Sequence, residues 1–183
     1  MSQLSLSFSS SDAASFLLVR EVAGNHLPAE PAEVLQAALR VLAGQVRDSE
    51  VLSSPQVVRD FLRIRLGTLE HEVFAVVHLD SQHRVVEYVE MFRVTVSQTS
   101  VYPREIVKEA MVRNSAARIL VHNHPSGSAE PSRADEALTQ TCRQALAPVD
   151  LRVLDHLIVA GATVVSGRLR RRGCFDAPGA SAL

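Results

Sequence analysis

The chain has 183 residues, of which 46% are hydrophobic, so it can bury a core of domain size. Its formal net charge is -1 at pH 7, which excludes a protein held to nucleic acid or to an anionic membrane by overall charge. No apolar run approaches the roughly 18 residues of a membrane span, and the first residues lack the pattern of a secretory signal. We therefore expect a cytoplasmic protein.

Two minor features add little chemistry. Cys142 and Cys174 fit no metal or redox spacing, so they are predicted to be reduced thiols. The dense basic cluster formed by Arg168 and residues 170–172 is predicted to be a solvated edge, with a contact to phosphate as the alternative.

The N-terminal part differs in composition from the rest. Residues 1–15 are rich in serine and lack periodicity, which predicts a disordered tail. Apolar residues at helical spacing predict an amphipathic helix over residues 31–44, and a serine N-cap followed by proline starts a second helix over residues 54–67. We therefore expect a tail and helical annex over residues 1–50, followed by the main domain over residues 52–175.

The main domain alternates strands and helices. Residues 72–79 (EVFAVVHL) are β-branched and nearly all apolar, which predicts a buried strand. A turn then leads to an alternating strand over residues 84–96, which predicts a hairpin. The remaining predicted elements are a helix from Pro103, a strand at 119–121, a helix from Ser132 to about Leu146, and strands near 151–160 and 163–166. The predicted class is α+β: a mixed, mostly antiparallel sheet flanked by helices in α/β/α layers, with an N-terminal helical segment.

One short stretch carries metal-ligand chemistry. His122, His124, Ser132 and Asp135 form the pattern H-x-H-x7-S-x2-D. In an extended segment, residues two apart point to the same side, so both imidazoles can face one point. Pro125-Ser126-Gly127 suits a sharp bend that returns Asp135 to that point. Two imidazoles and one carboxylate predict a catalytic zinc site with an open position for water.

Hydrolysis at such a site also needs a base that takes the proton of the water. Four glutamates lie on or beside the predicted hairpin, and periodicity does not choose among them: Glu70, Glu72, Glu87 and Glu90.

The pattern resembles the JAMM (MPN+, or JAB) metallopeptidase domain. HNHPSG, PSRAD, YPREIVKEA and LDHLIV are similar to its RadC branch over residues 54–160. The resemblance implies one Zn²⁺ per chain, with His122, His124 and Asp135 as the metal ligands. It also implies that Glu72 is the general base and acid, that Ser132 steadies an oxyanion, and that an amide or isopeptide bond of a protein or peptide is hydrolysed.

The chain departs from the RadC pattern in three places. Val94 stands where we expect glycine, the tail after Gly161 is longer and more basic, and residues 1–50 do not match a helix-hairpin-helix region. The alternative function is a DNA-associated RadC-like protein with a non-catalytic or nucleolytic role, and a third is a metal site that serves only as a scaffold for a protein interaction.

Several residues have simpler explanations. Ser132 and Asp135 also fit a capping box at a helix start, and Glu72 also fits a surface carboxylate at a strand end. Asp155-His156 is predicted to be a hydrogen-bonded structural pair, with contact to a metal ligand or direct ligation as alternatives. The other histidines are predicted to be packed or surface residues: His26, His71, His78 and His83.

Overall fold

The structure is a computed structural model, and it describes residues 18–20, 26–47, 55–94 and 101–167. Contacts divide the chain into two units, Met1–Val41 and Leu42–Leu183. The first unit contains an antiparallel pair of short strands, β1 (Leu18–Arg20) and β2 (His26–Pro28), which the sequence did not predict. Helix α1 (Pro31–Val46) begins at the predicted residue and runs two residues past Gly44. The tail predicted over residues 1–15 lies outside the described residues.

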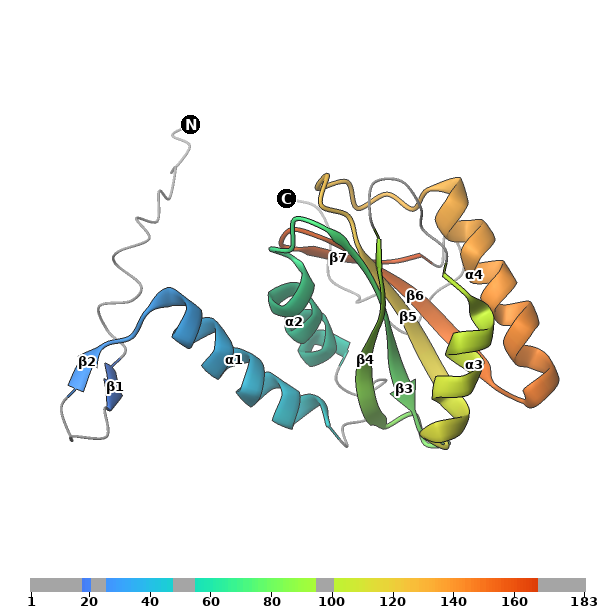
Figure 1. Ribbon diagram of the computed structural model, residues 1–183, viewed down its shortest axis with the longest axis horizontal. Coiled ribbons are helices and arrows are strands. Elements are labelled where there is room, and N and C mark those ends of the chain that lie inside the picture. Colours follow the sequence, from blue (N-terminus) through green and yellow to red (C-terminus); the bar gives the residue numbers. More distant parts are fainter. Residues whose placement is uncertain (1–17, 21–25, 48–54, 95–100, 168–183) are drawn as a thin grey trace, which may run out of the picture. The chain divides into compact units, whose positions relative to one another are not determined.

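A five-stranded sheet forms the centre of the second unit (Figure 1). Its order is β4 (Val85–Val94), β3 (Glu72–Leu79), β5 (Ala117–Asn123), β6 (Arg152–Ala160) and β7 (Thr163–Ser166). All neighbouring strands are antiparallel except β5 and β6, which are parallel. The predicted α+β class with a mixed, mostly antiparallel sheet is confirmed.

Helices cover both faces of this sheet (Figure 1). Helix α2 (Pro55–Leu66) lies on one face, and α3 (Pro103–Val112) and α4 (Arg133–Leu146) lie on the other. Because side chains alternate along a strand, Phe74, Val76 and Leu120 share the face toward α3 and α4 and pack with their buried residues. The two-sided burial explains why β3 is apolar almost throughout and why every residue of β5 is buried. Among the described helices, none has the length and apolar character needed to cross a membrane.

The connection between the parallel strands β5 and β6 determines where polar groups gather. The chain leaves β5, turns at residues 125–127 and enters α4, which crosses back to β6. Gly127 adopts a φ of 79°, and its N–H donates to the carbonyl of His124 at 3.1 Å. Glycine suits this left-handed conformation because it has no Cβ. The carboxyl end of β5 therefore meets the N-terminus of α4, as the predicted bend requires.

Candidate metal centre

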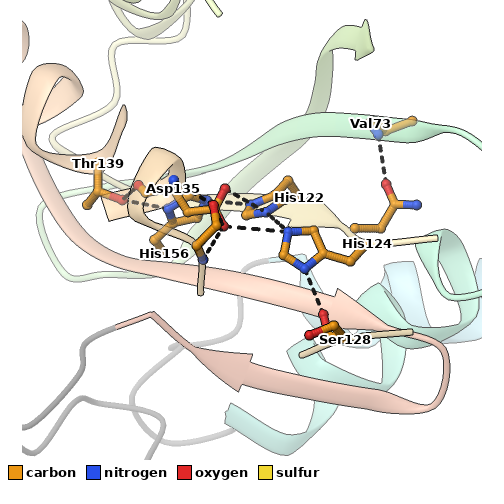
Figure 2. Close-up of polar contacts among 9 residues, drawn as sticks. Val73, His122, His124, Ser128, Asp135, Thr139 and His156 are labelled. Carbon is orange, nitrogen blue, oxygen red and sulfur yellow. Dashed lines mark hydrogen bonds and ion pairs between the residues drawn. The ribbon is translucent and has the colours of Figure 1, made fainter. Parts of the chain in front are cut away.

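The end of β5 and the first turn of α4 bring three ligand-type side chains together (Figure 2). His122 Nε2 lies 3.2 Å from Asp135 Oδ1, and His124 Nε2 lies 3.6 Å from Asp135 Oδ2. The two Nε2 atoms are 2.7 Å apart. His122 is 6% exposed, and the other two side chains are largely covered. These are the three residues that the sequence pattern placed at one point.

The donor set fits a small divalent metal ion. Bonds of about 2.0–2.1 Å in tetrahedral geometry place ligand atoms about 3.3 Å apart, close to the 3.2 Å between His122 Nε2 and Asp135 Oδ1. The two ring nitrogens would have to separate by about 0.6 Å to reach that spacing. Two imidazoles with one carboxylate leave a fourth position open, which is typical of catalytic sites. This group could therefore hold a metal ion.

Further hydrogen bonds orient the two histidine rings (Figure 2). His124 Nδ1 lies 2.7 Å from the carbonyl of Ser128, and His122 Nδ1 lies 2.8 Å from His156 Nε2. A carbonyl only accepts, so the proton of a neutral His124 ring resides on Nδ1. Its Nε2 lone pair is then free to bind a metal.

Asp155 and His156 form the hydrogen-bonded pair on a strand that the sequence predicts, and His156 also makes the alternative contact with a candidate ligand. Asp155 is structural, since it accepts hydrogen bonds from Ser166 Oγ and from the backbone of His156. His156 itself contacts the candidate ligand His122. Its ring is 2% exposed, and burial, together with the nearby His122, lowers its pKa to about 3. His156 is therefore neutral at pH 7.

Ser132 and Asp135 form a complete capping box at the start of α4. Asp135 Oδ2 accepts from both the backbone N–H and the hydroxyl of Ser132, each at 2.7 Å, and Asp135 N–H donates to Ser132 Oγ at 3.2 Å. Burial opposes ionisation of Asp135, but the nearby His122 imidazole and the hydrogen bonds from Ser132 hold its pKa below the usual value. The carboxylate is therefore charged, with Oδ1 left facing His122.

A cavity of about 540 Å³ adjoins the ligands. Its lining combines polar groups with a few apolar ones: Glu72, Val101, His124, Ser126, Ser128, Glu130, Ser132, Ala134, Asp135 and Leu138. Of the four glutamates considered from the sequence, Glu72 alone is among these lining residues. Glu87 and Glu90 instead pair with Arg113 and Arg65 at 2.7 and 2.8 Å.

Asn123, between the two histidines, contacts the backbone that carries Glu72. Its Oδ1 accepts from the N–H of Val73 at 2.7 Å, and its Nδ2 donates to the carbonyl of His71 at 3.0 Å. The residue is 2% exposed. The sequence pattern indicated no role for Asn123. Its partners lie about fifty positions earlier, and only the pairing of β3 with β5 brings them next to Asn123.

The sequence of this domain matches a known family. A model of the RadC-like JAB domain matches residues 52–173. The chain belongs to this family. The resemblance noted from the sequence is thereby confirmed.

Curated relatives are similar to this chain over most of its length. A UPF0758 protein of Leptothrix cholodnii is 58% identical over 133 residues, which is 73% of this chain and 60% of the relative. A UPF0758 protein of Polaromonas sp. is 55% identical over 142 residues, covering 76% and 63% of the two chains. This chain therefore spans about 60% of the length of these relatives, and their names state no activity.

Other predictions fall outside the candidate site of the RadC-like domain. Cys142 is a free thiol, and burial raises its pKa to about 11. Cys174 and the basic cluster at 168–172 lie outside the described residues. Val94, where the family pattern predicts glycine, pairs with Glu72 across β3 and β4.

Proposed function

We propose that this RadC-like JAB domain is a zinc-dependent peptidase of the JAMM type that hydrolyses an amide or isopeptide bond. The observation that carries the proposal is that Glu72 and Ser132 line the same cavity as the candidate ligands His124 and Asp135. A base, an oxyanion donor and metal ligands around one cavity are the parts that metal-assisted hydrolysis requires.

Each residue has a distinct task in this proposal. His122, His124 and Asp135 would hold the zinc, which supplies an acidified water and polarises the carbonyl. Glu72 would take the proton of the attacking water and return it to the leaving amine. Ser132 would turn its hydroxyl from Asp135 toward the developing oxyanion, while its backbone N–H continues to hold Asp135.

The charge of the cavity supports a peptide substrate over a phosphodiester. Its lining includes the carboxylates of Glu72, Glu130 and Asp135 and contains no lysine or arginine among the described residues. With neutral histidines, the three carboxylates and one Zn²⁺ would give the lining a net charge of -1. A phosphate group would therefore meet repulsion, whereas a neutral amide would not.

Comparison of wild type with Glu72→Gln, both loaded with zinc, tests the peptidase. Proteome-wide profiling of new N-termini and cleaved isopeptides should yield products for wild type, reduced by about 10² to 10⁴ in Glu72→Gln. Glu70→Gln is the matched control, because Glu70 is exposed and does not line the cavity. Identical profiles for wild type and Glu72→Gln would contradict the proposal and favour a scaffolding role for the metal site.

A binding assay tests the DNA-associated alternative. Binding to duplex and single-stranded DNA should be weak and change little with salt if the domain acts on proteins. A steep loss of affinity with added salt would show phosphate contacts and favour the alternative.

A further inference from the structure

A chain of hydrogen bonds runs from one candidate ligand to the backbone of another (Figure 2). His122 Nδ1 lies 2.8 Å from His156 Nε2, and His156 Nδ1 lies 2.6 Å from Thr139 Oγ1. Thr139 Oγ1 in turn donates to the carbonyl of Asp135 at 2.7 Å. This series of hydrogen bonds therefore starts at His122 on β5, passes through His156 on β6, and ends on α4 at the carbonyl of Asp135.

The carbonyl of Asp135, at the end of this series of hydrogen bonds, determines which atom donates in each bond. The carbonyl of Asp135 only accepts, so the hydroxyl of Thr139 uses its single proton there and accepts from His156 Nδ1. His156 Nδ1 therefore carries the ring proton, and the geometry leaves its Nε2 to accept from His122 Nδ1. His122 is left with an unprotonated Nε2, the atom that faces Asp135 and that a metal would bind.

The surroundings keep the His156 ring in place. The ring makes an edge contact with Phe74, whose centroid is 6.0 Å away, and both residues are almost fully buried. The backbone of His156 donates to Asp155, which Ser166 also holds. His156 cannot turn away without leaving a buried polar group unpaired, which costs about 1–3 kcal/mol.

We propose that His156 and Thr139 are positioning residues that select the metal-binding tautomer of His122 and tie it to Asp135. The proposal rests on the metal site of the proposed function, but it concerns residues that do not touch the metal. Its consequence is that metal affinity depends on the hydroxyl of Thr139 on α4, which is not itself a candidate ligand.

Zinc affinity of the intact chain, measured by competition with a chromophoric chelator, tests the proposal. Thr139→Val removes the acceptor for His156 while keeping the shape, so it should weaken zinc binding by about 10-fold or more. Thr139→Ser keeps the hydroxyl and should restore most of the affinity. Thr141→Val is the matched control, because Thr141 Oγ1 makes the same type of bond to Ala137 on α4 but contacts no histidine.

A second readout is the position of the ring protons, which a merely structural threonine would not determine. In zinc-loaded wild type, ¹⁵N NMR of the imidazoles should place the protons of His122 and His156 on Nδ1. A proton on Nε2 of His156, or equal zinc affinity for Thr139→Val and Thr141→Val, would overturn the proposal while leaving the metal site intact. Failure of wild type to bind zinc would overturn the metal site as well.

Discussion

The carboxamide of Asn123 accepts a hydrogen bond from the N–H of Val73 and so holds the backbone on which Glu72 begins β3. Its amide also donates to the carbonyl of His71, so the two bonds enclose Glu72 from both sides along the chain. β5 ends at Asn123. The side chain of Asn123 therefore replaces the strand partner that the start of β3 would otherwise lack on the side of β5. The candidate base and the candidate ligands are therefore linked through one residue.

Replacement of Asn123 by alanine should loosen the start of β3. The buried N–H of Val73 and the carbonyl of the exposed His71 would lose their partner, and loss at the buried group alone is expected to cost about 1–3 kcal/mol in the free energy of unfolding. Hydrogen exchange of the Val73 amide should accelerate strongly, while the amide of Val77 within β3 serves as the internal control. Turnover should fall by about 10²-fold through misplacement of Glu72. Unchanged exchange at Val73 would contradict this role.

Zinc should stabilise the fold through its three ligands. A ligand that binds only the folded state at about 100 times its Kd adds about 3 kcal/mol, so thermal unfolding should shift upward with zinc and return with chelator. His122→Gln, His124→Gln and Asp135→Asn should each abolish the shift. His71→Gln, a replacement of an exposed side chain, should retain it. A shift that survives loss of the ligands would place the metal elsewhere.

Ser132→Ala separates the two roles of this serine. Loss of the N-cap should cost about 1 kcal/mol in stability, measured by chemical denaturation. Loss of an oxyanion donor should in addition lower turnover by about 10² to 10³, and Ser132→Thr should restore both. A destabilised variant with unchanged turnover would leave Ser132 as a helix cap alone.

The buried His78 should make the fold sensitive to acid. Burial, reinforced by the charges of Arg118 and Arg113, lowers its pKa from 6.5 to about 3. Between these values the unfolded state binds a proton that the native state does not, so stability falls as pH drops below 6.5. The slope is at most about 1.4 kcal/mol per pH unit.

Denaturation curves recorded with chelator at several pH values measure this slope without metal release. His78→Asn keeps a hydrogen-bonding group near Ser115, the present partner of His78, but does not titrate. The variant should lose less stability than wild type between pH 6.5 and 4. Parallel pH profiles would show that His78 is not responsible.

Elements with strong local sequence signals could be predicted from the sequence. β3 occupies the predicted residues 72–79, because an apolar, β-branched run of eight residues suits only a buried strand. Helices α2 and α3 begin at the predicted prolines Pro55 and Pro103, and Ser132 caps α4. In each case the residues that predict the element lie within it or next to it in the sequence.

Features that depend on strand register could not be predicted in this way. His156 reaches His122 only because β5 and β6 run parallel, and their register shifts between Arg118 and Ile119. The contacts of Asn123 depend equally on where β5 leaves the sheet. The strands β1 and β2 have three residues each, too few to show an alternating pattern.

The crossover from β5 through α4 to β6 also bears on how such domains could diversify. The candidate metal ligands lie at the two ends of the loop over residues 125–131, and Ser126, Ser128 and Glu130, which line the cavity, lie within it. Surface loops accept changes of length at low cost, since closure entropy grows slowly with loop length. Insertions after Gly127 could therefore reshape the cavity while the candidate metal centre is inherited unchanged.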